Sequence, residues 1–225
     1  MDGAEERFET VRRQIDDLAK RFPDGIIVIG GYAVFLHTQR RGLLRPERTR
    51  DGDFMMTRAR YEELKRIREV TDNPRLGKHE FKDGKVGFDI YLEHESNQLP
   101  LNYATVSDWS TIINGVRIAC LEHLLILKMR AMNDRKESEH GLKDERDIVK
   151  IVTMLGNPNP SAFGEHLTEK SLSELEAIEH DAAVFNEIAH GNRHEAAKIR
   201  KEYSENFSAL KISLEARRKE RGNET

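Results

Sequence analysis

The stretch that decides the fold is IIVIGG, residues 26–31, together with DGDFMM, residues 51–56. The β-branched residues of the first segment predict a buried strand, and its glycine pair predicts a tight turn into a helix over 32–37. The apolar FMM at the end of the second segment indicates that the acidic residues begin another strand. The two segments therefore predict the order strand, turn, helix and strand.

Asp51 and Asp53 are the centre of the predicted chemistry. Side chains repeat on the same face of a strand every second residue, so both carboxylates would face one cavity. The alternative is a polar turn, for which Asp-Gly-Asp is equally suited. The apolar residues that follow favour the strand.

Asp89 supplies a third carboxylate, within the apolar segment VGFDIYL, residues 86–92. A carboxylate in such a strand is costly unless it is paired or binds a metal. It could complete a metal shell or deprotonate an attacking hydroxyl; the alternative is the exposed face of an edge strand, because Tyr91 shares that face. Three carboxylates without cysteine or histidine partners suit Mg²⁺, with Mn²⁺ as a substitute.

Gly30 and Gly31 follow the first strand and open a helix. Backbone N–H groups at a helix N-terminus favour a phosphate, and glycine allows close approach. Any tight strand-to-helix turn would use such a pair as well.

The segment that leads to the acidic pair is basic. Arg48 and Thr49 lie just before the acidic pair, and we predict that they bind the nucleotide. The arginines could grip a triphosphate or a nucleic-acid backbone, or form a solvated loop. They are Arg40, Arg41, Arg45, Arg48 and Arg50.

Lys128 falls in the middle of an apolar helical face, and Asp144 lies on the apolar stripe of the next predicted helix. A lysine in that position must reach solvent or meet an anion. The pattern indicates either an interhelical salt bridge or a phosphate-binding lysine that is held by a carboxylate.

Bulk properties narrow the class of protein. The chain has 225 residues, 34% of them charged, with a net charge of −3 and a pI near 6.3. With a negative net charge, the chain has no overall positive field of the kind that favours nucleic-acid binding. Any contact with nucleic acid would rely on local basic patches. The single cysteine, Cys120, excludes an internal disulfide, and no apolar signal or spanning segment is seen, so we expect a cytoplasmic protein without membrane contacts.

The order of elements predicts an α+β fold: a small mixed β-sheet flanked by helices, followed by an α-helical C-terminal part. We place the α/β core at 1–118 and the helical domain at 119–225, with an internal break near 156–160. The turns Asp83-Gly84 and Asn114-Gly115 predict two hairpins. Helices are expected over 5–22, 58–70, 120–134, 143–155, 171–190 and 193–219.

The run IGGYAVFLH…RTRDGDFMM…VGFDIYL…LEHLLILKMRAMNDR…KDERDIVKI, within residues 25–155, resembles the DNA polymerase β-like nucleotidyltransferase superfamily. More narrowly, it is similar to the minimal nucleotidyltransferases of toxin–antitoxin systems, including the AbiEii type. Gly52 replaces the apolar residue usual between the aspartates, a change that could loosen the strand. The resemblance implies phosphate contacts at the glycine pair, Mg²⁺ at the three aspartates, and functional roles for the lysine and aspartate named above: Gly30, Gly31, Asp51, Asp53, Asp89, Lys128 and Asp144.

The reaction implied by the resemblance is transfer of a nucleoside monophosphate from a nucleoside triphosphate to an acceptor, with release of pyrophosphate. In toxin relatives the acceptor can be tRNA or a protein, and a cognate antitoxin would be a partner. One alternative is a small-molecule nucleotidyltransferase that modifies an antibiotic such as an aminoglycoside, which would need an acidic acceptor pocket. Another is a non-catalytic interaction protein on the same fold.

Overall fold

The computed structural model describes residues 3–39, 44, 46–93, 99–135 and 138–223. The chain forms two compact units. The first contains Met1–His37 and Pro46–Cys120, and the second contains Thr38–Arg45 and Leu121–Thr225.

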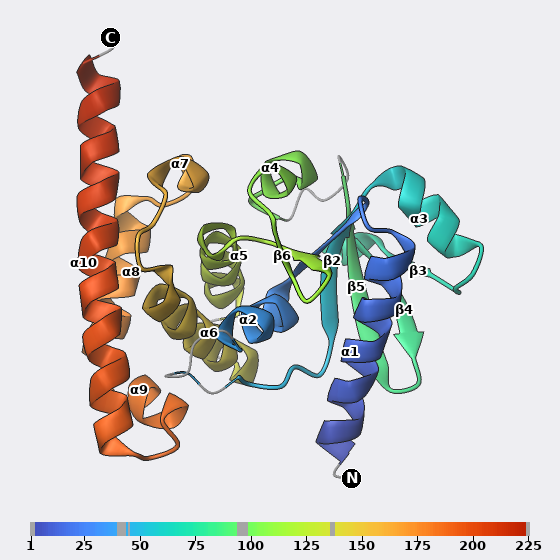
Figure 1. Ribbon diagram of the computed structural model, residues 1–225, viewed down its shortest axis with the longest axis horizontal. Coiled ribbons are helices and arrows are strands. Elements are labelled where there is room, and N and C mark those ends of the chain that lie inside the picture. The colour runs from blue at the N-terminus through green and yellow to red at the C-terminus, as the bar shows by residue number, and fades with distance from the viewer. Residues whose placement is uncertain (1–2, 40–43, 45, 94–98, 136–137, 224–225) are drawn as a thin grey trace. The chain divides into compact units, whose positions relative to one another are not determined.

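The first unit is built on a seven-stranded mixed sheet with the order β3-β4-β5-β2-β1-β7-β6 (Figure 1). β2 pairs parallel with β5, and β1 pairs parallel with β7, whereas the other neighbours are antiparallel. This architecture confirms the predicted α+β fold with a mixed sheet. The strands are β1 (Ile26–Ile29), β2 (Gly52–Met56), β3 (Thr71–Asn73), β4 (Lys78–Asp83), β5 (Val86–Leu92), β6 (Thr111–Ile113) and β7 (Val116–Ile118).

Helices flank this sheet. α1 (Gly3–Arg21) packs its apolar stripe, including Val11 and Ile15, onto one face of the sheet, because burying that stripe stabilises both elements. In Figure 1 it is the blue helix beside β5. The other helical elements of the unit are α2 (Gly30–Thr38), α3 (Arg58–Lys65), the 3₁₀ turn η1 (Pro74–Leu76) and α4 (Tyr103–Asp108).

The prediction of one helix over 58–70 is wrong beyond residue 65. The backbone N–H of Arg66 bonds back to the carbonyls of Glu63 and Leu64, which ends α3. The chain then forms β3, which pairs with β4. Long-range pairing of this kind leaves little trace in local periodicity.

Both predicted hairpins are confirmed. β4 and β5 are joined at Gly84, whose φ is +59°, and β6 and β7 are joined at Asn114 and Gly115, with φ of +53° and +80°. Positive φ at both Asn114 and Gly115 is the geometry of a two-residue type I′ turn. In the first hairpin Asp83 pairs with Val86, so the central residues are Gly84 and Lys85, one position later than predicted, and only Gly84 has a positive φ.

The second unit is helical, with α5 (Leu121–Asp134) packed against α6 (Glu139–Leu155). The remaining helices are α7 (Pro160–Phe163), α8 (Glu169–His180), α9 (Ala182–Ile188) and α10 (Arg193–Asn223). The predicted single helix over 171–190 is wrong, because Asp181 interrupts it. The Asp181 side chain accepts a hydrogen bond from Ala183 N and caps α9.

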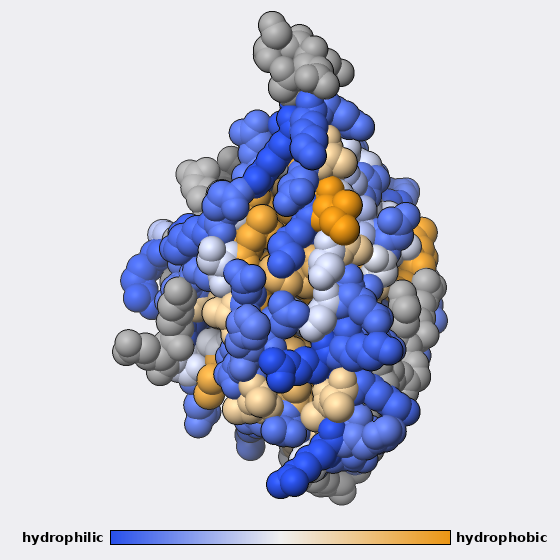
Figure 2. Space-filling model, turned by 90° about the vertical axis from the view of Figure 1, so that its left-hand side faces the viewer, coloured by the Kyte–Doolittle hydropathy of each residue, from blue (hydrophilic) through white to orange (hydrophobic). Residues whose placement is uncertain are grey.

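α10 packs along α6 to α9 through an apolar stripe that includes Tyr203 and Leu210, as its spacing predicted. Figure 2 shows the face that carries α10: hydrophilic side chains dominate it, and the apolar patches are small and interrupted. Over the described residues, no helix combines the length and apolar character needed to cross a membrane.

Candidate active site

Asp53 and Asp89 lie side by side on adjacent strands. The parallel register of β2 and β5 pairs Asp53 with Asp89, and the antiparallel register of β5 and β4 pairs Asp89 with Glu80. Residues paired in this way share a face of the sheet, so the three carboxylates form a row across β2, β5 and β4. The expected placement of a third carboxylate on a neighbouring strand is therefore observed, while its role remains a prediction.

Asp51 lies just before β2, in a bend, rather than within the strand. It is exposed, and the hydroxyl of the buried Thr49 donates a hydrogen bond to Asp51 Oδ1 at 2.8 Å. Both interpretations of the DGD segment are thus partly right, because a bend carries Asp51 and the strand carries Asp53. Thr49, assigned to the nucleotide, orients the first carboxylate.

Gly30 makes room for the Asp53 carboxylate. Its φ is +65°, and a Cβ added there would lie 2.2 Å from Asp53 Oδ2, far inside van der Waals contact. α2 begins at Gly30, two residues earlier than predicted, so Gly30 and Gly31 form its first turn. The backbone N–H groups of this turn therefore open beside the Asp53 carboxylate.

Gly52 has a packing function on the opposite face of β2. Its register partner is Phe88, and a Cβ at Gly52 would lie 2.6 Å from Phe88 Cδ1 and 3.5 Å from Ile15 Cδ1. The ring of Phe88 fills the volume that a larger residue at 52 would need. The loosening that Gly52 could cause is not seen in the pairing: β2 pairs with β5 from Gly52 to Met56, and with β1 from Asp53 to Met56.

Asp89 is paired rather than isolated. Lys78 Nζ, on β4, donates a hydrogen bond to Asp89 Oδ2 and forms an ion pair with it. Burial raises the pKa of Asp89, contact with Lys78 opposes that rise, and the negative charges of Glu80 and Asp51 add to it.

Lys78 and Glu80 are site residues that the sequence reasoning missed. Counting outward from the observed Gly84-Lys85 turn pairs Glu80 with Asp89, whereas the predicted Asp83-Gly84 turn would have paired Lys78 with Asp89. Lys78 falls two residues earlier, on the same face.

The carboxylates offer only oxygen donors, which fits a hard divalent cation such as Mg²⁺. Within the described ranges, no three His, Cys, Asp or Glu side chains are already arranged to hold a metal ion. Magnesium dependence therefore stays a prediction that rests on donor chemistry and register.

The basic segment is only partly described. Arg48 forms an ion pair with Glu5 on α1 at 3.3 Å, and its guanidinium lies 5.8 Å from the centre of the Phe8 ring. Arg50 is exposed. The other three arginines, Arg40, Arg41 and Arg45, lie outside the described residues.

Lys128 belongs to a buried ion network within the helical unit. Its Nζ lies 2.9 Å from Asp144 Oδ1 and 2.8 Å from Asp147 Oδ2. Burial alone would lower the pKa of Lys128, but attraction to Asp147 and Asp144 outweighs it and leaves the pKa raised. Arg135 contacts Asp144 at 2.8 Å, and Lys150 contacts Asp147 at 3.6 Å. This is the interhelical salt bridge, extended by a second aspartate.

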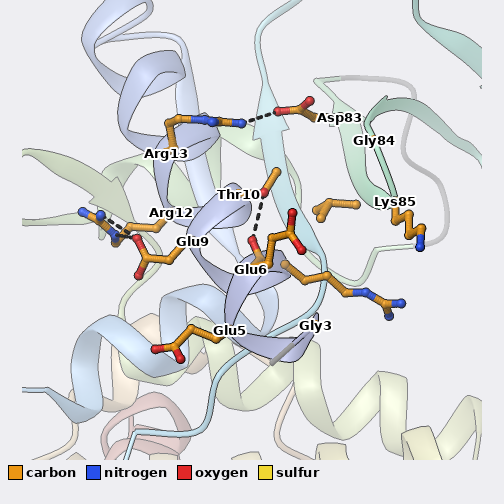
Figure 3. Close-up of a pocket in the computed structure, with 12 residues that line it drawn as sticks. Gly3, Glu5, Glu6, Glu9, Thr10, Arg12, Arg13, Asp83, Gly84 and Lys85 are labelled. Carbon is orange, nitrogen blue, oxygen red and sulfur yellow. Dashed lines mark hydrogen bonds and ion pairs between the residues drawn. The ribbon is translucent and has the colours of Figure 1, made fainter. Parts of the chain in front are cut away.

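A pocket of about 960 Å³ lies between α1 and the β4–β5 turn (Figure 3). Asp83 at its rim accepts hydrogen bonds from Arg13 at 2.9 Å and Gln14 at 2.6 Å, which tie the helix to the hairpin. The candidate site residues do not line it. We therefore assign these contacts to packing of α1.

Comparison with known proteins identifies the fold. No family model matches the chain, and no curated protein matches it. Among solved structures, JHP933 from Helicobacter pylori is 16% identical over 97% of both chains, with a TM-score of 0.51. The antibiotic-resistance factor ANT(2'')-Ia is 16% identical over 76% of this chain and 94% of that one, with a TM-score of 0.50. The chain has a nucleotidyltransferase-like fold.

These likenesses bear on the fold alone, since the identities are low. The alignment with JHP933 covers 97% of this chain, so it takes in helices of the second unit as well as the sheet.

Proposed function

We propose that this protein is a metal-dependent nucleotidyltransferase that moves a nucleoside monophosphate from a nucleoside triphosphate to an acceptor. The observation that carries the proposal is the pairing of Asp53 with Asp89, beside a glycine turn that leaves room for the Asp53 carboxylate. The fold is consistent with this chemistry.

Asp51, Asp53 and Asp89 would hold Mg²⁺ or Mn²⁺. When bound, the metal would neutralise phosphate charge and lower the pKa of the attacking hydroxyl. Thr49 keeps the Asp51 carboxylate oriented through its 2.8 Å hydrogen bond. The first turn of α2, which starts at Gly30, offers backbone N–H groups to the phosphates.

In the proposed reaction an acceptor hydroxyl oxygen bonds to the α-phosphorus. The bond between that phosphorus and the oxygen bridging to the β-phosphate breaks, and pyrophosphate leaves with the electron pair. The proton of the acceptor passes to a carboxylate of the site, for which Asp89 is the candidate. Asp51 and Asp53 would hold the divalent cation, whose charge would offset that of the α-phosphate during this displacement.

The acceptor we favour is tRNA or a protein, as in toxin enzymes of toxin–antitoxin or phage-defence systems. This finer part of the proposal rests on the sequence resemblance. It implies that expression of the active protein arrests growth and that a cognate antitoxin relieves the arrest.

The test is transfer of label from the four α-³²P nucleoside triphosphates, with Mg²⁺, into the RNA and protein fractions of a cell extract. Wild type should label one fraction, and Asp53→Asn should reduce labelling by about 100-fold or more, in line with loss of a group that acts on the transition state. Asp17→Asn is the matched control, because it makes the same change on an exposed position of α1. Transfer that survives Asp53→Asn, or nucleotide binding without transfer to either fraction, would contradict the proposal.

A second candidate is an antibiotic nucleotidyltransferase, and one observation favours it. The helical unit has a groove of about 350 Å³ whose charged lining residues are all acidic: Glu145, Glu174 and Asp181. An acidic groove suits a polycationic acceptor such as an aminoglycoside. Protection of growth in the presence of aminoglycosides would favour this candidate, and growth arrest would favour the toxin.

A further inference from the structure

Lys78 occupies an unusual position for a site that is proposed to bind cations. Its ammonium contacts Asp89 Oδ2, and the two side chains are only 15% and 23% exposed. Solvent therefore screens the pair less than it would screen a surface salt bridge. The contact joins the first residue of β4 to the middle of β5.

The charges around this contact explain why a cation lies there. Asp53, Asp89 and Glu80 form one row across three strands, and like charges directly opposite each other on a sheet are destabilising. Lys78 shares the face of Glu80, two residues away along β4, so its ammonium offsets part of this repulsion. A divalent cation bound to the aspartates would do the same.

The two cations therefore compete for one carboxylate. A metal that binds Asp89 Oδ2 must displace the ammonium, and a metal that binds the other oxygen meets a positive charge close by. In either case Lys78 lowers the affinity for the metal. The lysine side chain has a flexible four-carbon stem, so it can leave without movement of the strand.

We propose that Lys78 is an internal counter-cation, which holds Asp89 in the metal-free protein and sets the affinity of the site for its divalent metal. This inference rests on the metal site of the proposed function. It adds a residue that positions a metal ligand.

The test is Mn²⁺ binding to the full-length protein without nucleotide, followed by electron paramagnetic resonance of free Mn²⁺, with calorimetry for Mg²⁺. Lys78→Gln should bind Mn²⁺ about three- to tenfold more tightly, the change expected from removing one partly screened charge. Lys78→Arg, which keeps the charge, should stay within about twofold of wild type.

Lys82→Gln is the matched control. Lys82 lies on the same strand and the same face as Lys78, but its side chain is 70% exposed and contacts Glu80 at 3.5 Å rather than Asp89. The substitution removes the same charge, yet it should leave Mn²⁺ affinity unchanged. An equal gain in both variants would mean that net charge, rather than the Asp89 contact, controls affinity, and would overturn the inference.

The outcomes separate this inference from the proposed function. If wild type binds Mn²⁺, Asp53→Asn does not, and Lys78→Gln binds no tighter than wild type, the role of Lys78 is wrong and the metal site stands. If Lys78→Gln binds more weakly, Lys78 supports Asp89 instead of competing for it, and the inference fails. If neither wild type nor Lys78→Gln binds Mn²⁺ while both show cooperative thermal unfolding, the metal site itself is wrong.

Discussion

Replacement of Lys128 by methionine tests whether the buried ion network of α5 and α6 is structural. The ammonium lies 2.9 Å from Asp144 and 2.8 Å from Asp147, and it is 9% exposed. The carboxylates themselves are 3% and 4% exposed. Methionine fills most of the lysine volume, so the change removes the charge and leaves two buried anions short of a partner.

The stability lost in Lys128→Met depends on the ion pairs that the two aspartates keep. Removing one partner of a buried ion pair costs about 3–5 kcal/mol, because the other charge is left uncompensated. Here Arg135 still contacts Asp144 and Lys150 still contacts Asp147, so we expect the lower end, about 3 kcal/mol. That is a large share of the ~5–15 kcal/mol that stabilises a typical domain, and it corresponds to about 6–12 °C in the melting temperature.

The assay is urea unfolding followed by circular dichroism, with a thermal melt in parallel. Lys170→Met is the control, because Lys170 is 77% exposed and lies 3.9 Å from Glu174, so its loss should cost less than about 0.5 kcal/mol. A loss below about 1 kcal/mol for Lys128→Met, together with nucleotide binding weakened tenfold or more, would refute the structural role. It would instead identify Lys128 as the phosphate-binding lysine that the sequence pattern also allowed.

Three further predictions concern the glycines of β2 and α2 and a buried histidine. Gly30→Ala should abolish metal and nucleotide binding measured by calorimetry, whereas Gly84→Ala, with a similar positive φ but no atom within 4 Å of its added Cβ, should cost only about 1–2 kcal/mol of stability in urea unfolding. Gly52→Val should destabilise the protein by about 1–3 kcal/mol through its clash with the Phe88 ring, and adding Phe88→Ala should recover part of that loss; no recovery in the double variant would disprove the clash. Burial lowers the pKa of His123 in the folded protein, so below about pH 6.5 the unfolded chain binds a proton that the folded protein does not, and the urea midpoint should fall as the pH drops. His123→Asn should make the urea midpoint less dependent on pH in this range. An unchanged pH dependence in His123→Asn would contradict the role of His123.

The sequence was sufficient for the local parts of the fold. Strong periodicity located α1 and α10, and turn chemistry located both hairpins, since these signals lie within a few residues of one another. β3 and the interruption at Asp181 were missed for a different reason. A three-residue edge strand has no pattern of its own, and a capping aspartate inside a helical run is outweighed by its neighbours.

The candidate site also has residues that local sequence patterns predict and residues that depend on long-range pairing. Asp53 and Asp89 could be proposed as neighbours because each lies within an apolar strand, although nothing local fixes their register. Lys78 was missed because the sequence of β4 is mostly polar and gives no strand pattern. The role of Lys78 becomes visible only once β4 and β5 are paired residue by residue. Lys128 was found from helical geometry, while its second partner, Asp147, lies one step off the apolar stripe.

Gly52 and Phe88 share a single volume between two strands, and this has a consequence for the recognition of distant relatives. A search pattern that demands an apolar residue between the two aspartates would pass over this chain, although Asp53 keeps its register with Asp89. Positions 52 and 88 should therefore vary together, with a bulky residue at one accompanied by a small residue at the other. The pair, rather than either residue alone, is the unit that selection can be expected to preserve.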